Sequence, residues 1–221
     1  MIKLVVFDWN GTILSDTNAI VVGVNARLKF FDHPAITIKQ YRDVFQMPAI
    51  KLYEALGIDT KQYDKAAEQN HSKLFHDAYE AKAIHARTRA GTREVLTFLE
   101  KVGISKILLS NHTVSSIKTQ CKRLKLDSYF ETVLANDDVW NAYLKGKKDR
   151  LVQYLADSKL KPSEVLIIGD STEEIEIGKE LGLHTVAISG GFVSTKRLKY
   201  ANPDVLIHKL RDLIDVIKEI K

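Results

Sequence analysis

The stretch Leu4-Val5-Val6-Phe7-Asp8-Trp9-Asn10-Gly11-Thr12 decides the fold of this chain. A continuous apolar run leads into an aspartate, and a Gly-Thr turn follows. Such a run is typical of a strand buried on both faces, the kind found in parallel sheets. Open parallel sheets bind ligands at the carboxyl ends of their strands, so we expect Asp8 to face a crevice. There it would act as a nucleophile, ligate a metal, or simply cap the turn.

Strands and helices alternate again from Gly91 to the end of the chain. Helical patterns separate the further apolar runs, which we expect to form strands at 106–109, 131–135, 165–168, 184–188 and 205–207. Ser110-Asn111 should end the first of these strands. Alternation of this kind predicts the α/β class, with βα units around a parallel sheet.

The segment from Asp16 to Ala86 differs, because it carries helical patterns and no strand signal. Asp16 and Thr37 are suited to cap the first two of its helices. We therefore expect residues 16–86 to form a small helical cap domain over the crevice. Residues 1–15 and 87–221 would then form the α/β core domain.

Composition narrows the class of protein. A chain of 221 residues, 45% of them hydrophobic, suits one domain with a modest insert. The single cysteine, Cys121, excludes an intramolecular disulfide, so a cytoplasmic setting is the expected default, and this thiol is expected to be buried and inert. No apolar run is long enough to span a membrane, and no signal peptide is seen. The net charge of +5 is spread along the chain without a recognition motif, which argues against nucleic acid.

Polar residues of complementary chemistry end three of the expected strands: Asp8, Ser110 and Asp170. The turn Lys145-Gly146-Lys147-Lys148 precedes the helix that leads into the Asp170 strand. Two carboxylates facing each other repel, so a divalent cation between them is expected, and Mg²⁺ prefers such oxygen ligands. A metal, a hydroxyl and an ammonium around one crevice suit a phosphoryl group, whose charge must be neutralised during transfer.

These residues resemble the four motifs of the haloacid dehalogenase superfamily, in the right order: Asp8-Trp9-Asn10-Gly11-Thr12, Ser110-Asn111, a lysine before a helix, and Gly169-Asp170-Ser171-Thr172-Glu173-Glu174. The helical insert resembles the small α-helical cap of its phosphoglycolate-phosphatase-like members, in particular a subgroup whose first motif reads Asp-Trp-Asn-Gly-Thr. The resemblance covers nearly the whole chain. It implies a Rossmann-like, doubly wound parallel sheet with an inserted cap.

The resemblance also implies a metal site. Asp8 would be the nucleophile that forms an aspartyl-phosphate. Mg²⁺ would bind the carboxylates of Asp8 and Asp170 and the backbone carbonyl of Asn10. Glu174 stands where the family has a second acidic residue, which usually holds the metal through water.

Further roles follow from the same resemblance. Ser110 would donate a hydrogen bond to a phosphoryl oxygen, and a lysine would neutralise the phosphoryl group and Asp8. Lys148, at the helix start, is the favoured lysine, and Lys145 is the alternative. The expected contacts of the substrate include Gly11, Thr12 and Asn111.

Asn10 is the main departure from the family pattern. Most phosphatases of the superfamily carry Asp there as general acid and base, and an amide serves neither purpose. General acid–base catalysis contributes about 10²–10⁴-fold, so the change predicts slow turnover of poor leaving groups. His112 is a possible source of the proton, although a loop histidine bonded to the backbone is the simpler interpretation.

Our first hypothesis is a Mg²⁺-dependent phosphatase of a small phosphorylated metabolite, acting as a monomer or weak homodimer. A second is a protein that binds a phosphorylated ligand or partner with negligible turnover because of Asn10. Carbon–halogen or carbon–phosphorus cleavage is a third. The retained Asp170 and Glu174 argue against metal-free dehalogenation. A phosphonatase would need a desolvated cap lysine, and nothing marks the candidates as desolvated: Lys29, Lys39 and Lys51.

Overall fold

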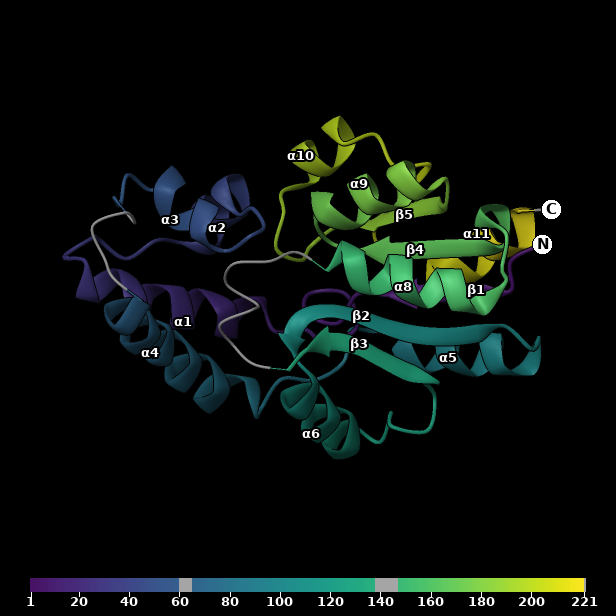
Figure 1. Ribbon diagram of the computed structural model, residues 1–221, viewed down its shortest axis with the longest axis horizontal. Coiled ribbons are helices and arrows are strands. Elements are labelled where there is room, and N and C mark those ends of the chain that lie inside the picture. The colour runs from purple at the N-terminus through teal and green to yellow at the C-terminus, as the bar shows by residue number, and fades with distance from the viewer. Residues whose placement is uncertain (60–64, 138–146, 221) are drawn as a thin grey trace.

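A parallel sheet forms the centre of the molecule (Figure 1). The computed structural model describes residues 1–59, 65–137 and 147–220, and for residues 65–71 the backbone only. Within them six strands pair in parallel in the order β3-β2-β1-β4-β5-β6. The strands are β1 (Leu4–Phe7), β2 (Ser105–Thr113), β3 (Thr132–Asn136), β4 (Val165–Gly169), β5 (His184–Ile188) and β6 (Val205–Ile207). β1 therefore lies between β2 and β4, which carry Ser110 and lead into Asp170.

Helices cover both faces of this sheet. Val5 and Phe7 of β1 join the apolar core on one face, and Leu4 and Val6 join the core on the other. The sheet is therefore doubly wound, and the α/β, Rossmann-like prediction is confirmed. The helices around it are α5 (Thr92–Lys101), α6 (Val114–Leu124), α8 (Lys148–Ser158), α9 (Thr172–Leu181), α10 (Thr195–Tyr200) and α11 (Leu213–Glu219), with 3₁₀ turns at Pro162–Glu164 and Leu210–Asp212.

The segment after β1 forms a helical insert, which lies to one side of the sheet in Figure 1. Its described helices are α1 (Thr17–Phe30), α2 (Ile38–Val44), α3 (Ile50–Ala55) and α4 (Lys65–Ala83). Their apolar core includes Val24 and Leu28 of α1 and continues into Phe192 beside the sheet. Thr37 caps α2 as predicted, with Gln40 N–H donating to its hydroxyl at 3.2 Å.

Two local predictions are wrong. Asp16 does not cap α1 through its side chain, because its carboxylate accepts from the backbone N–H of Gly11 instead. Strand β2 does not end at Ser110 but runs to Thr113, which pairs with Asn136 of β3 after an irregularity in register. The longer strand holds Ser110 and His112 on a regular element rather than on a free loop.

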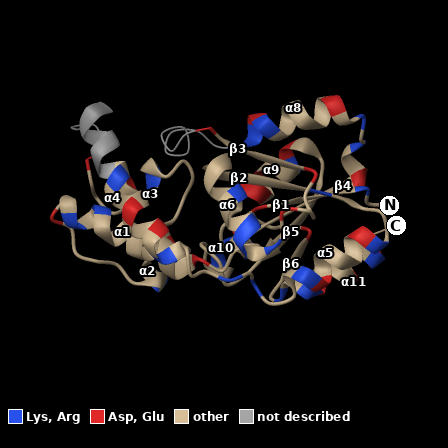
Figure 2. Cartoon of the chain, turned by 90° about the horizontal axis from the view of Figure 1, so that it is seen from below, with Lys and Arg blue, Asp and Glu red and all other residues tan. Residues whose placement is uncertain are grey.

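Charge and burial agree with a compact globular protein. Lys and Arg are interspersed with Asp and Glu over elements at both ends of the molecule (Figure 2). Cys121 is buried, and burial raises the pKa of its thiol to about 12, so it is the inert thiol that was predicted. Among the described residues, no helix is both long and apolar enough to cross a membrane.

Gly178 allows α9, the helix that carries Glu173 and Glu174, to lie directly on β4 and β5. A Cβ at this position would lie 2.4 Å from Cγ2 of Thr185 and 2.7 Å from Cγ2 of Ile167. We expect Gly178→Ala to lower the free energy of unfolding by about 1–2 kcal/mol in urea denaturation. Overpacking costs about 1–3 kcal/mol, which exceeds the gain of about 1 kcal/mol in helix propensity.

The control is the double variant Gly178→Ala with Thr185→Ser. Serine removes the crowding methyl but keeps the hydroxyl that donates to Asp204 Oδ2 at 2.9 Å. We expect Gly178→Ala to cost less stability when it is added to Thr185→Ser than when it is added to the unmodified chain. Equal stability of Gly178→Ala and the unmodified chain would contradict this account of the packing.

Candidate active site

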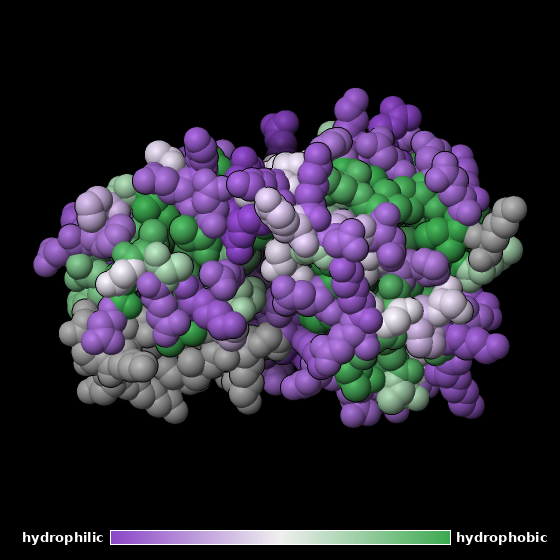
Figure 3. Space-filling view, turned by 90° about the horizontal axis from the view of Figure 1, so that it is seen from above, coloured by the Kyte–Doolittle hydropathy of each residue, from purple (hydrophilic) through white to green (hydrophobic). Residues whose placement is uncertain are grey.

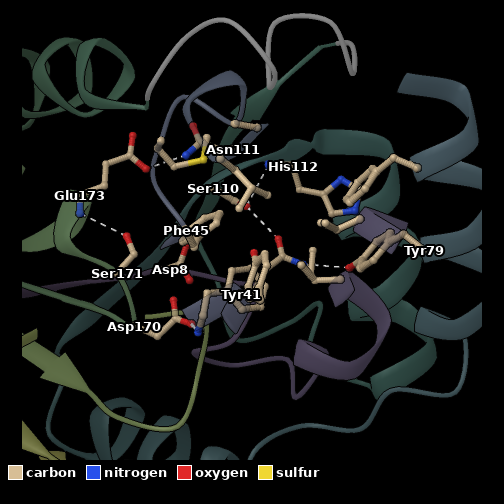
Figure 4. A pocket seen from close by; sticks show the side chains of 18 of the residues that line it. Asp8, Tyr41, Phe45, Tyr79, Ser110, Asn111, His112, Asp170, Ser171 and Glu173 are labelled. Atoms are coloured by element: carbon tan, nitrogen blue, oxygen red, sulfur yellow. Dashed lines mark hydrogen bonds between the residues drawn. The ribbon is translucent and has the colours of Figure 1, made fainter. Parts of the chain in front are cut away.

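The carboxyl ends of β1, β2 and β4 meet at a cavity of about 150 Å³ beneath the helical insert (Figure 4). Its floor contains four of the predicted side chains, which come from separate strands and turns. They are Asp8, Asn10, Ser110 and Asp170. The expectation that the strand ends converge is met because these strands are neighbours in the sheet.

Lys147 is the lysine of this site. Its ammonium is 2.6 Å from Asp8 Oδ1, contacts Glu174 Oε1, and the residue is 2% exposed. The backbone N–H of Lys147 donates to Glu173 Oε1 at 3.1 Å, which holds the turn before α8 in place. Burial alone would lower the pKa of Lys147, but Asp8 and Glu174 raise it above its ordinary value. The ammonium is therefore a permanent positive charge beside Asp8.

The prediction that Lys148 is the lysine beside Asp8 is wrong. Its ammonium lies at the surface and pairs with Glu180 of α9, and it does not line the cavity. Lys147 precedes the first residue of α8, and consecutive residues at a helix start point about 100° apart. Only one of the two neighbouring side chains can therefore enter the sheet edge. Lys145, the alternative, lies outside the described residues.

The floor of the cavity carries an excess of buried negative charge. Burial raises the pKa of Asp8 to about 7, with a smaller contribution from Glu174 and an opposing one from Lys147. Burial and then Asp8 raise the pKa of Asp170 well above its ordinary value. Buried carboxylates that share one ammonium favour either protonation or a second cation. Among the described atoms, Asp8 Oδ2 is buried and has no hydrogen-bond partner.

Glycines hold Asp170 close to the turn after β1. A Cβ on Gly11 would lie 2.0 Å from Asp170 Oδ2, and one on Gly191 would lie 1.9 Å from it. Gly11 also has a φ of +77°, which non-glycine residues rarely adopt. Arg89 fixes this turn by donating to the carbonyls of Gly11 at 2.7 Å and Ser189 at 2.6 Å. Gly11 thus shapes the floor without lining the cavity.

These features fit Mg²⁺. The described residues contain no group of three or more His, Cys, Asp or Glu side chains able to hold a metal. Mg²⁺ does not need such a group, since it binds through one or two carboxylates and keeps several waters. The carboxylates of Asp8 and Asp170, which lie together on the floor and repel each other, supply that donor set. Glu174 is engaged by Lys147 and accepts from Ser171 Oγ at 2.7 Å, so its contact with a metal through water stays a prediction.

Asn10 is held by a three-membered hydrogen-bond network. Its Nδ2 donates to Asp16 Oδ2 at 2.7 Å and to the Tyr79 hydroxyl at 2.9 Å. Tyr79, from α4, in turn donates to Asp16 Oδ2 at 2.8 Å. Because a carboxylate only accepts, the amide nitrogen must face Asp16, and Asn10 Oδ1 must face Ser110, whose hydroxyl lies 3.4 Å away. The site therefore receives a hydrogen-bond acceptor from Asn10 and no acid.

The side chains after Ser110 are engaged with their surroundings. His112 Nδ1 accepts from Thr113 N–H at 2.7 Å, which confirms the backbone-bonded histidine. The ring proton therefore belongs on Nε2, which lies 3.4 Å from Glu80 Oε1 of α4. Asn111 Nδ2 donates to Glu173 Oε2 at 2.6 Å, so its amide nitrogen is already used.

The other two predicted substrate contacts are placed differently. Thr12 is fully buried and, like Gly11, is not among the residues that line the cavity. Both belong to the turn that carries Asp8 rather than to the surface a substrate would touch. A turn glycine signals backbone geometry more directly than it signals contact with a ligand.

A second set of contacts holds the insert against the sheet. Arg42 of α2 donates to the carbonyls of Gly190 at 2.7 Å and Gly191 at 2.8 Å. Arg197 of α10 returns a bond to the carbonyl of Phe45 at 2.7 Å. Figure 3 shows hydrophilic atoms gathered where the two parts of the molecule meet on this face. These bonds fix α2 beside the Gly190-Gly191 loop, which packs against Asp170.

The sequence analysis did not identify two residues that hold the floor of the cavity in place, Tyr79 and Arg89. Tyr79 reaches Asn10 across 69 residues of sequence, and Arg89 reaches Ser189 across 100. No local pattern reports such contacts. The order of lysines at 145–148 did indicate that one would enter the site, but it could not show that this one is Lys147.

Residues 5–188 match the model of the haloacid dehalogenase-like hydrolases. The chain is 25% identical over 215 residues to a phosphoglycolate phosphatase of Pseudomonas syringae pv. tomato, covering 96% of this chain and 78% of that one. It is 26% identical over 216 residues to the pyrophosphatase PpaX of Anoxybacillus flavithermus, covering 98% and 97%. The structure of a predicted phosphatase from Clostridium acetobutylicum has a TM-score of 0.83 at 19% identity and covers 99% of both chains.

The matched range contains the whole floor of the cavity, from Asp8 to Asp170 and Glu174. The similarity to the solved structure supports the same fold independently of the sequence match. The resemblance inferred from the four strand-end motifs is thus confirmed. The chain belongs to the haloacid dehalogenase-like hydrolase family.

Proposed function

We propose that this hydrolase is a Mg²⁺-dependent phosphatase that acts on a small phosphorylated metabolite through an aspartyl-phosphate. One observation carries the proposal. Lys147 holds Asp8 Oδ1, whereas Asp8 Oδ2 is buried without a hydrogen-bond partner among the described atoms, and Asp8 lines the cavity. A carboxylate with one oxygen fixed and the other available is oriented for nucleophilic attack. Relatives named as phosphoglycolate phosphatase and pyrophosphatase support a phosphoryl substrate.

The residues of the floor would divide the reaction between them. Asp8 Oδ2 attacks phosphorus, the bond to the leaving oxygen breaks, and water then releases phosphate from Asp8. Lys147 keeps Asp8 ionised, and the Ser110 hydroxyl turns from Asn10 to a phosphoryl oxygen. Asp8, Asp170 and the Asn10 carbonyl would hold Mg²⁺, which would offset the negative charge of the phosphoryl group.

Asn10 would act by position rather than by proton transfer. Its Oδ1 faces the floor because Asp16 and Tyr79 hold its nitrogen. A carbonyl acceptor at this point orients the O–H of the attacking water or of the departing alcohol. The proton for a poor leaving group must then come from solvent, which predicts slow turnover of such substrates.

We propose in addition that residues 16–86 form a cap domain that closes over residues 1–15 and 87–221. Tyr79 and Arg42 support this division, because each joins the insert to the floor or its neighbouring loop through hydrogen bonds. Opening would also separate the rings of Tyr41 and Phe45 from Phe192. Closure would exclude water while the phosphoryl group is on Asp8.

A protein that binds a phosphorylated ligand with negligible turnover is the second candidate. The observation that favours it is the amide of Asn10, which cannot act as a general acid or a general base. Cleavage of carbon–phosphorus bonds is less well supported, because Lys29, Lys39 and Lys51 are all exposed and none lines the cavity. A Schiff-base lysine is activated by desolvation, which these three exposed side chains lack.

The decisive experiment is release of inorganic phosphate from p-nitrophenyl phosphate, measured with Mg²⁺ and with EDTA. We expect release only with metal and none from Asp8→Asn, which keeps the shape but removes the nucleophilic charge. Thermal unfolding of Asp8→Asn shows that the variant is folded. Metal-independent release, or an active Asp8→Asn, would overturn the proposal. Ligand-dependent stabilisation without any release would favour the binding protein.

The neighbouring lysines provide a matched pair. We expect Lys147→Met to lower kcat/KM by at least about 10²-fold, because removal of one preorganised charge donor typically costs that much. Lys148→Met should change it by less than about twofold, since Lys148 pairs with Glu180 at the surface. Steady-state kinetics on both variants test this, with circular dichroism to compare their folds. The reverse order of effects would restore Lys148 as the site lysine.

Asn10→Asp separates the two candidate functions. In the unmodified chain Asn10 Nδ2 lies 2.7 Å from Asp16 Oδ2, so a new carboxylate would be repelled by Asp16. For an enzyme adapted to Asn10 we expect phosphate release to fall or stay within about twofold. A rise of tenfold or more would show that the site lacks only its acid, as the binding hypothesis requires. Asn111→Asp, which also introduces a carboxylate in the cavity wall, is the control for charge.

A further inference from the structure

The cavity has two chemically different ends. The floor at the sheet edge is charged, as described above. The roof comes from the insert and is mainly apolar, with aliphatic and aromatic side chains from α1, α2, α3 and α4. Its principal members are Ile20, Val24, Tyr41, Phe45, Leu52 and Phe75. The roof is where the part of a substrate beyond its phosphoryl group would lie.

Aromatic rings bring the apolar roof down to the reaction centre. Tyr41, Phe45 and Phe192 form a triangle with centroid separations of 5.2, 5.5 and 5.9 Å. Two of the three ring pairs, those with Phe192, meet edge to face, which is a favourable arrangement. The backbone N–H of Phe192 donates to Asp170 Oδ2, and Figure 4 shows Tyr41 and Phe45 beside Asp8 and Asp170. An apolar surface therefore begins directly next to the nucleophile.

Few groups in the described roof could bind an anion. Arg27 is its cationic side chain, and the guanidinium already lies over the ring of Tyr53, 4.1 Å from the centroid. His76 is largely buried, and this burial lowers its pKa to about 4, so the imidazole is neutral near pH 7. Asp16 and Glu80 bond Asn10 and His112 of the cavity lining from behind, so they add negative charge there rather than a site for an anion.

Size limits the occupant as well. The cavity volume is about 150 Å³. An apolar protein cavity of roughly this volume holds one benzene molecule. Because the phosphoryl group shares this volume, the part of the substrate in the roof can be no larger than about one ring.

We propose that, among phosphate monoesters with similar leaving oxygens, the roof selects those of uncharged, apolar alcohols about the size of one aromatic ring in preference to those of small acids. This inference rests on the proposed phosphatase activity and names its substrate class. The bond broken is the one between phosphorus and the alcohol oxygen. The alcohol leaves with a proton from solvent, and water supplies the oxygen of the released phosphate.

The test compares esters that differ in the roof-facing group but have similar leaving oxygens. We expect kcat/KM for 2-phenylethyl phosphate to exceed that for ethyl phosphate by about tenfold or more, because even one buried methylene contributes about tenfold. Phosphoglycolate should fall below 2-phenylethyl phosphate. All three esters are assayed by phosphate release with Mg²⁺, beside p-nitrophenyl phosphate.

The outcomes separate this inference from the proposed function. If p-nitrophenyl phosphate and ethyl phosphate are hydrolysed but the phenyl group gives no advantage, the substrate class is wrong and the phosphatase stands. Preference for phosphoglycolate that is lost in Arg27→Met would also overturn it. If no ester is hydrolysed, the proposed function fails. Binding of 2-phenylethylphosphonate against ethylphosphonate then tests the roof, and equal dissociation constants overturn the inference.

Two valines on α1 give a matched pair of variants. Val24 lines the roof and is 2% exposed, whereas Val22 is 43% exposed on the other side of the helix. Val24→Phe should fill the ring space and reduce the preference for 2-phenylethyl over ethyl phosphate by about tenfold. Val22→Phe adds the same group outside the cavity and should leave the preference unchanged. An undiminished preference in a folded Val24→Phe would contradict the assignment of the roof.

Discussion

The buried contact between Lys147 and Asp8 is the interaction on which the rest of the site depends. A lysine that is 2% exposed pays a large desolvation cost unless its charge is matched, and here Asp8 and Glu174 match it. Buried ion pairs of this kind are weak evidence for stability. The arrangement is better understood as a device that fixes one oxygen of Asp8 and leaves the other for chemistry. The turn before α8 supplies Lys147, and the first turn of α9 supplies Glu174.

The neighbours of Asn10 decide which atom of its amide the site receives. Asp16 and Tyr79 bind the amide nitrogen, so the amide oxygen faces Ser110. Because Tyr79 belongs to the insert, the orientation of this amide depends partly on where the insert lies against the sheet.

Reaction and specificity are assigned to different parts of the chain. The floor is built from strand ends and is held by glycines and Arg89, so it tolerates little variation. The roof is built from helices whose apolar residues also form the core of the insert. The aromatic wall of Tyr41, Phe45 and Phe192 joins the two, because Phe192 also donates to Asp170 from its backbone N–H.

The sequence by itself determined the α/β fold, the helical insert and the meeting of Asp8, Ser110 and Asp170, because hydrophobic periodicity and strand ends are local patterns. Only the tertiary structure decided that Lys147 rather than Lys148 enters the site, since neighbouring residues at a helix start diverge in direction. It also decided that Asp16 binds the Gly11 turn instead of capping α1. Contacts such as Tyr79 with Asn10 join residues far apart in the chain, and their geometry follows from packing that no local pattern records.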